Sequence, residues 1–268
     1  MLKTRIIPCL LLKDWGIEKS IRFRDPVYVG SPINAARVFN GRNVDELILL
    51  DIIATEEGRG PRTEIVAQIA EETAMPITVG GGIRDIETVR ALMEAGADRV
   101  VINTGAHEIP GLVGEASDRF GRQCVVVSID VKQHDGGDYE VFSHGAARAT
   151  GHDPLAWALE VERRGAGEIL LTSIDRDGTM QGYDLPLIRR VADELKIPLI
   201  ACGGAGSVSD LAAAVREGHA SAVCAGAFFL FYGRRRTVLI TYPTDEELLE
   251  HFDPALVRLK GQPRLTRL

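Results

Sequence analysis

The strongest constraint on the fold of this chain is a long internal repeat. Residues 77–106 read ITVGGGIRDIETVRALMEAGADRVVINTGA, and residues 199–228 align with them as LIACGGAGSVSDLAAAVREGHASAVCAGAF. The shift places Gly81 opposite Gly203. A repeat this long exceeds the period of a solenoid protein. It therefore predicts two fused halves of one larger unit.

Apolar strand-like runs alternate with amphipathic helical segments along almost the whole chain, and continuous Val, Ile and Leu runs are typical of a parallel sheet buried on both faces. This alternation predicts an α/β fold, a single (β/α)₈ TIM barrel built of two fused half-barrels. A doubly wound open sheet is the alternative, but the sequence lacks the GxGxxG opening of that fold. The predicted strands span residues 5–12, 46–52, 77–79, 99–103, 124–130, 168–173, 199–202 and 221–225. The predicted helices include residues 33–40, 63–73, 86–95, 154–164, 187–195 and 208–217.

The length of 268 residues fits one barrel domain. No linker rich in Pro or Ser separates the halves, so we expect a barrel over residues 1–250 and a peripheral C-terminal tail over residues 251–268. The net charge of −7 argues against a nucleic-acid partner or an anionic membrane surface. The sequence shows neither a membrane-spanning apolar stretch nor a signal-peptide pattern, which predicts a cytoplasmic protein.

The cysteines and histidines show no metal-binding spacing. Each cysteine lies in an apolar strand-like run, which predicts buried thiols in a reducing compartment. The 6 histidines form no HxxxH or HExxH pattern. We therefore expect no protein-bound metal and no cofactor. The cysteines are Cys9, Cys124, Cys202 and Cys224.

Paired glycines follow two predicted strands, and a helix is expected directly after each pair. Glycine lets the backbone approach a ligand closely, and a helix N-terminus favours an anion. Two such sites at one barrel mouth fit a ligand that is phosphorylated at both ends. The alternative is that the glycines merely form tight turns between strand and helix. The predicted pockets comprise Gly81, Gly82, Asn103 and Thr104 in one half and Gly203, Gly204, Ala225 and Gly226 in the other.

Carboxylates also occur at the predicted carboxyl ends of the strands, where barrel enzymes place their reacting groups. Asp51 and Asp130 each end a long apolar strand, and a buried carboxylate is either paired or a candidate acid or base. Asp175 and Asp177 lie in the segment DRDGT, which could also be a simple turn with Gly178.

The opposite ends of four strands each begin with a charged residue. These residues are Arg5, Glu46, Arg99 and Glu168. Two acids and two bases could form a neutral ring across the barrel floor. Taken from the residues alone, ordinary solvated strand starts are the alternative.

Several segments together resemble the cyclase subunit of imidazole-glycerol-phosphate synthase. They are RIIPCLLLKD, DELILLDI, TVGGGIRD, INT, SIDVK, RGAGEILLTSIDRDGTMQGYD and ACGGAG, in the order and spacing of that family. The resemblance covers about residues 1–230. The sister isomerase of histidine biosynthesis has the same fold and similar glycine pairs, but it is a poorer match.

The resemblance implies a heterodimer in which a glutaminase subunit docks on the barrel floor and releases ammonia. The ammonia passes a charged gate, formed at the positions of Arg5, Glu46, Arg99 and Glu168, and reacts at the mouth with a bis-phosphorylated ribonucleotide. Asp98 matches a position that faces the glutaminase. On this reading the floor residues are a gate rather than solvated strand starts. The implied substrate- and phosphate-binding residues are Lys19, Asp51, Gly81, Gly82, Asn103, Thr104, Thr172, Asp177, Gly178, Gly203, Gly204, Ala225 and Gly226.

One expected catalytic residue is missing. The family uses two aspartates as general acid and base, and Asp130 matches the second of them. The first falls on Leu11, which the internal alignment of residues 7–13 with residues 126–132 also pairs with Asp130. Leucine cannot transfer a proton, and such catalysis typically contributes ~10²–10⁴-fold.

The segments at residues 21–30 and 231–243 also depart from the family pattern. These departures resemble the HisF-like, glycosyl-amidation-associated branch of bacterial surface-polysaccharide clusters. That resemblance implies ammonia delivery to a separate sugar amidotransferase that makes acetamidino sugars, with the basic residues 234–236 as a partner contact or a solvated turn. Two functions therefore remain open, an ammonia-conducting subunit and a genuine cyclase/lyase of histidine biosynthesis.

Overall fold

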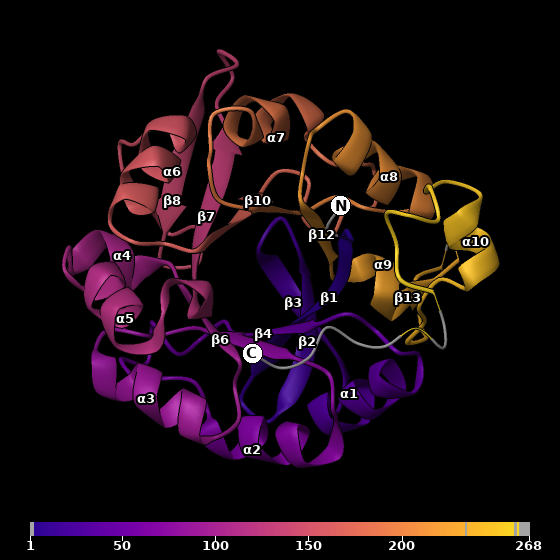
Figure 1. The fold of residues 1–268 in the computed structure, drawn as a ribbon, viewed down its shortest axis with the longest axis horizontal. Coiled ribbons are helices and arrows are strands. Elements are labelled where there is room, and N and C mark those ends of the chain that lie inside the picture. The colour runs from indigo at the N-terminus through magenta and orange to yellow at the C-terminus, as the bar shows by residue number, and fades with distance from the viewer. Residues whose placement is uncertain (1–2, 234, 260–261, 263–268) are drawn as a thin grey trace.

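The structure, a computed structural model, describes residues 3–233, 235–259 and 262. Its centre is a closed barrel of parallel strands (Figure 1), and this confirms the predicted (β/α)₈ fold. Pairing of β1 with β12 and of β6 with β7 joins the two halves of the chain. The barrel strands are β1 (Arg5–Lys13), β4 (Leu47–Asp51), β5 (Ile77–Gly80), β6 (Arg99–Ile102), β7 (Val125–Gln133), β10 (Glu168–Ser173), β11 (Leu199–Cys202) and β12 (Ala222–Ala225).

Helices surround the strands as an outer ring (Figure 1). Several begin at a polar residue whose side chain accepts a backbone N–H bond, as Asp85 and Ser207 do for α3 and α8. The principal helices are α1 (Pro32–Gly41), α2 (Thr63–Glu72), α3 (Ile86–Glu94), α5 (Leu112–Phe120), α6 (Pro154–Arg163), α7 (Leu185–Ala192) and α8 (Val208–Arg216). Shorter helical segments are α4 (Thr104–Glu108), α9 (Ala227–Leu230), α10 (Asp245–Leu249) and a 3₁₀ turn (Arg122–Cys124). In the part of the chain that the structure describes, no helix is long and apolar enough to cross a membrane.

Antiparallel strands that the sequence did not reveal extend β1 and β7 at the mouth. β2 (Gly16–Ile21) pairs with β1 and with β3 (Arg24–Gly30). In the second half, β8 (Tyr139–Ser143) pairs with β7 and with β9 (Arg148–Ala149). A further small hairpin joins β13 (Phe231–Tyr232) to β14 (Thr237–Val238). The mouth is therefore shaped by hairpins as well as by loops.

Two apolar layers hold the barrel together. The larger layer lies between the strands and the helices. The smaller layer fills the interior of the barrel and consists of alternate strand residues, because successive side chains point to opposite faces of a strand. The inner layer contains Ile7, Cys9, Ile48, Val101, Val126, Leu170, Ile200, Cys202, Ala222 and Cys224.

The segment after α10 packs against the start of β1. Phe252 and Val257 are buried. The backbone N–H of Thr4 donates to the carbonyl oxygen of Leu256, and Arg258 pairs with Asp45 at 2.8 Å. The boundary expected at residue 250 stays a prediction, and residues 260, 261 and 263–268 of the expected tail lie outside the described residues.

Candidate functional site

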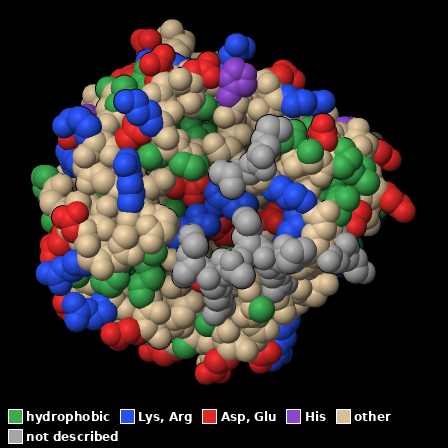
Figure 2. Space-filling view, viewed as in Figure 1, with side chains coloured by type: hydrophobic (Ala, Val, Ile, Leu, Met, Phe, Trp, Pro, Cys, Tyr) green, Lys and Arg blue, Asp and Glu red, His purple; other side chains and the backbone are tan. Residues whose placement is uncertain are grey.

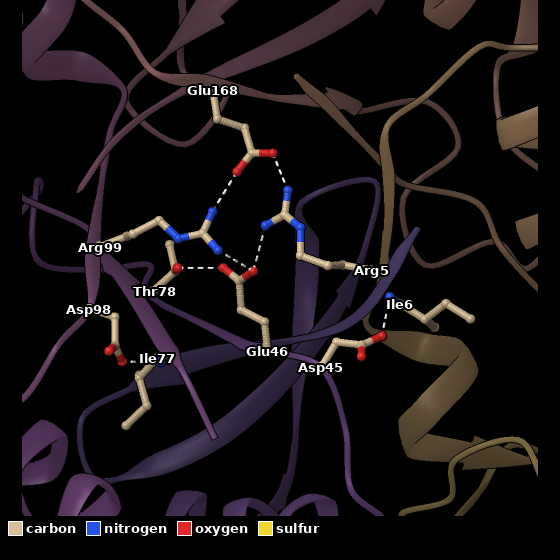
Figure 3. A network of polar contacts seen from close by, with 9 residues as sticks. All are labelled: Arg5, Ile6, Asp45, Glu46, Ile77, Thr78, Asp98, Arg99 and Glu168. Atoms are coloured by element: carbon tan, nitrogen blue, oxygen red, sulfur yellow. Dashed lines mark hydrogen bonds and ion pairs between the residues drawn. The ribbon is translucent and has the colours of Figure 1, made fainter. Parts of the chain in front are cut away.

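A ring of charged side chains crosses the barrel floor (Figure 3). One Arg5 nitrogen lies 2.6 Å from a Glu46 carboxylate oxygen, and another pairs with Glu168. Arg99 bridges the same two carboxylates at 2.7 Å and 2.6 Å. The Thr78 hydroxyl donates to the second oxygen of Glu46 at 2.5 Å. The four residues predicted at the strand starts therefore form one cyclic network.

The ring is largely removed from water. The Glu46 side chain is 1% exposed and that of Arg5 is 15% exposed. Burial raises the pKa of Glu168, and the nearby guanidinium groups oppose this rise. Burial alone lowers the pKa of Arg5, but the two carboxylates raise it above its ordinary value. Figure 2 shows acidic and basic side chains gathered in a hollow at the centre of this face.

Asp98 lies beside the ring at the start of β6. One of its carboxylate oxygens accepts the backbone N–H of Ile77 at 2.9 Å (Figure 3). The carboxylate therefore ties the beginnings of two neighbouring strands together while its residue stays half-buried at the floor.

A cavity of about 1140 Å³ occupies the opposite end of the barrel, at the carboxyl ends of the strands. It brings together most of the predicted site residues from both halves of the chain. Its lining includes Leu11, Lys19, Asp51, Gly81, Gly82, Asn103, Thr104, Asp130, Thr172, Asp177 and Gly226. The predicted residues Gly178, Gly203, Gly204 and Ala225 do not line it.

Asp130 lies at the bottom of this cavity, 8% exposed. The Asn103 amide donates to one carboxylate oxygen at 2.7 Å, and the Ser128 hydroxyl donates to the other at 3.2 Å. Burial raises the pKa of Asp130 to about 7, against the hydrogen bond from Ser128. A carboxyl group with a pKa near neutrality can both give and take a proton.

Leu11 faces the same cavity from β1 and packs against the inner apolar layer. It occupies the place in the first half that Asp130 occupies in the second. Asp51, the other carboxylate of the first half, is held by Arg59 at 2.6 Å and by the backbone N–H of Ala54 at 3.1 Å. Through these bonds Asp51 holds the loop after β4 in place.

We predict a pH-dependent contribution of Asp130 to stability. Its folded pKa of about 7 lies above the roughly 3.9 of an unfolded aspartate. Between these values the folded state holds a proton that the unfolded state releases, so the contribution is full below about pH 4 and is lost as the pH rises through about 7. Urea unfolding from pH 4 to pH 8 should show this decline in the natural protein and a flatter profile in Asp130→Asn. Parallel profiles would contradict the prediction.

The glycine pair of the first half, predicted to bind an anion, is open to the cavity. Gly81 and Gly82 are half-exposed and have φ values of 110° and 65°. A Cβ atom on Gly82 would lie 1.9 Å from the carbonyl oxygen of Arg59, so only glycine fits this turn. Asn103 and Thr104 end the next strand and also line the cavity.

Most of the equivalent pocket of the second half is covered, although Gly226 still lines the cavity. Gly178, Gly203 and Gly204 are buried. A Cβ atom on Gly178 would lie 2.3 Å from the carbonyl oxygen of Ser20, and the Arg22 backbone N–H donates to the Asp177 carbonyl oxygen at 2.9 Å. The β2–β3 hairpin therefore rests directly on this loop.

The Lys19 side chain points from the hairpin toward the pocket of the second half. Its ammonium group lies 2.7 Å from a carboxylate oxygen of Asp177, and its side chain is 2% exposed. Burial raises the pKa of Asp177, while the Lys19 charge opposes the rise. A Cβ atom on Gly226 would lie 3.0 Å from Lys19 Cε. The two predicted residues thus pair with each other and fill part of the second pocket.

A second basic side chain reaches the same loop. The Arg236 guanidinium donates to the carbonyl oxygen of Gly178 at 2.8 Å and lies over the ring of Phe231. Of the basic residues 234–236, Arg234 lies outside the described residues.

Sequence reasoning missed a charged cluster beside the open pocket. Glu108 approaches His144 at 3.1 Å, Arg148 at 3.5 Å and Arg84 at 3.6 Å, and all four line the cavity. The two residues from the β8–β9 hairpin carried no motif. Only Arg84, two residues after Gly82, had a position that could have marked it as a site residue.

The architecture is that of a TIM-barrel protein with a polar cavity at the carboxyl ends of its strands. A family model described as "Histidine biosynthesis protein" matches residues 5–234. The putative imidazole glycerol phosphate synthase subunit hisF2 of Pseudomonas aeruginosa is 46% identical over 248 residues, which are 92% of this chain and 99% of that protein. The imidazole glycerol phosphate synthase subunit HisF of Hyphomonas neptunium is 52% identical over 231 residues, 86% of this chain and 91% of that protein. The chain therefore belongs to the HisF family of histidine biosynthesis proteins.

Proposed function

We propose that this chain is a HisF-type subunit that conducts ammonia and leaves the final chemistry to another enzyme. A glutaminase subunit docks at the floor, near Asp98, and releases ammonia there. The ammonia passes the charged ring and the apolar interior and leaves at the mouth. A sugar amidotransferase consumes it there in the synthesis of an acetamidino sugar of the O-antigen type.

The single observation that carries this proposal is Leu11 at the cavity wall. The cavity combines a buried Asp130, whose pKa lies near neutrality, with an apolar side chain at the matching place in the other half. One carboxyl group cannot serve as acid and base at two sites of a ring closure at once. The floor ring, in contrast, has all four of its charged members in contact.

The decisive experiment supplies ammonium salt in excess to the purified protein with the bis-phosphorylated ribonucleotide and no glutaminase. Formation of imidazole glycerol phosphate is followed for the natural protein and for Leu11→Asp. We expect no turnover by the natural protein. If the loss of one acid–base partner is the sole defect, Leu11→Asp should gain roughly 10²–10⁴-fold.

Two further results decide how the turnover assay is interpreted. Asp130→Asn in the Leu11→Asp background should abolish any restored turnover, because both carboxylates are then required. The proposal would be overturned if the natural protein catalysed the reaction and Leu11→Asp did not raise the rate.

The second candidate function is the cyclase/lyase reaction that forms imidazole glycerol phosphate in histidine biosynthesis. It is favoured by the pKa of Asp130, which suits general acid–base work, and by the size of the cavity. On this view Asp130 serves as acid and as base in successive steps, and the phosphorylated ligand is held by the open pocket around Gly82 and Thr104. The same turnover assay separates the two functions.

A further inference from the structure

Three of the four cysteines point into the interior of the barrel. Cys9 of β1, Cys202 of β11 and Cys224 of β12 all belong to the inner apolar layer and are 5%, 7% and 0% exposed. Cys124 ends the 3₁₀ turn before β7 and lies outside that layer. The closed barrel brings the three thiols together, although they come from widely separated parts of the chain.

The three thiols come from consecutive strands. β11 and β12 pair in parallel with Cys202 opposite Cys224. β12 in turn pairs with β1, with Cys224 opposite Ile7, so that Cys9 lies one inward-facing step closer to the mouth. Neighbouring strands are about 4.8 Å apart, and disulfides join Cα atoms roughly 4.4–6.8 Å apart. Inside a closed barrel the inward Cα–Cβ bonds converge, which brings the sulfur atoms closer.

Two of the thiols are reachable from the mouth. Cys9 and Cys202 line the large cavity, as do Lys19 and Thr172. The neighbouring thiols of Cys224 and Cys9 hold the pKa of Cys202 below its ordinary value, burial opposes this effect, and the charge of Lys19 adds to it. Burial raises the pKa of Cys224. The thiolate, which is the nucleophilic form of cysteine, is therefore favoured at Cys202, one of the two cysteines that line the cavity.

We propose that these three cysteines form an oxidisable site, at which hydrogen peroxide that enters from the mouth converts Cys202 and a neighbouring cysteine into a disulfide. The Cys202 sulfur attacks one peroxide oxygen. The O–O bond breaks, leaving a sulfenic acid on Cys202 and releasing water after protonation. The sulfur of Cys224 or Cys9 then attacks the Cys202 sulfur. The S–S bond forms, the S–O bond breaks, and the hydroxyl leaves as water with the proton of the second thiol.

The overall step consumes two thiols and one hydrogen peroxide and gives one disulfide and two waters.

A metal site is a poorer interpretation of the same residues. Among the described residues, no group of three or more His, Cys, Asp or Glu side chains is arranged to hold a metal ion. The inference goes beyond ammonia conduction and is independent of the acceptor.

The test treats the full-length native protein with hydrogen peroxide, blocks remaining thiols with an alkylating reagent after denaturation, and maps them by mass spectrometry. We expect loss of two alkylatable thiols, a linked peptide pair that contains Cys202, and full recovery with a dithiol reductant. Cys202→Ser and Cys202→Ala cannot form this disulfide, and they should link the remaining pair, Cys9 and Cys224, at least roughly tenfold more slowly than the natural protein forms its disulfide, because the attacking thiolate is gone. Circular dichroism spectra confirm that each variant is folded.

Cys124→Ser provides the matched control, because this thiol lies outside the barrel interior, and its oxidation pattern should equal that of the natural protein. Three outcomes would overturn the proposal. They are native thiols that react only after unfolding, a stable sulfenic acid with no linked peptide, and equally fast disulfide formation in both Cys202 variants.

Discussion

Glu46→Ala is expected to lower the free energy of unfolding by about 3–5 kcal/mol, which is the usual effect of removing one partner from a buried ion network. Glu46 is 1% exposed and accepts bonds from Arg5, Arg99 and Thr78. Its loss leaves two guanidinium groups with one carboxylate between them. Urea denaturation followed by circular dichroism measures the change.

The matched control is Glu115→Ala, which removes another glutamate from an ion pair. Glu115 lies 2.8 Å from Arg119 on the surface of α5, and both side chains are 49% exposed. This substitution should cost no more than about 0.5 kcal/mol. A loss of less than about 1 kcal/mol in Glu46→Ala, as at an exposed pair, would show that the floor ring is hydrated and mobile in solution.

Gly82→Ala is expected to be the most damaging single change at the mouth. The left-handed backbone conformation costs an alanine about 1–2 kcal/mol. The added methyl group would lie 1.9 Å from the Arg59 carbonyl oxygen, and such overpacking adds about 1–3 kcal/mol. Because the loop must shift to relieve this contact, the variant should also bind inorganic phosphate more weakly if the open pocket is the proposed phosphate site.

Gly58→Ala separates the two causes. Gly58 has a φ of 66°, close to the 65° of Gly82, but a Cβ atom there meets nothing within 4 Å. It should show only the backbone cost of about 1–2 kcal/mol. Thermal unfolding of the two variants gives the contribution of the close contact as their difference. Equal losses of stability in the two variants would mean that the loop around Gly82 shifts without a measurable energetic cost.

The barrel could be predicted from local sequence patterns, and the family resemblance then favoured a charged ring at its floor over ordinary solvated strand starts. Each barrel strand is a continuous apolar run, and in a closed parallel barrel all strand starts meet at one end. Arg5, Glu46, Arg99 and Glu168 each stand at the beginning of such a run, so their meeting follows from the topology. Leu11 and Asp130 could be compared because the internal repeat sets them in register.

The hairpins and the covered pocket could not be predicted in this way. Strands β2 and β3 form a hairpin in which β3 carries exposed Val27 and Tyr28 beside Pro26 and Asp25, and this mixture has no clean alternation. Their packing depends on a contact between Ser20 and a loop more than 150 residues away. Such long-range contacts leave no periodic signal in the sequence.

The β2–β3 hairpin affects the direction in which a ligand with two similar ends would bind. The repeated halves offer matching glycine turns, and a symmetrical mouth would accept such a ligand in either direction. Here Ser20 rests on Gly178 and Lys19 fills the space beside Gly226, while Gly81 and Gly82 remain accessible. The near-twofold repeat of the barrel is thus broken at its mouth, and the direction of such a ligand would be set by one hairpin rather than by the glycine turns themselves.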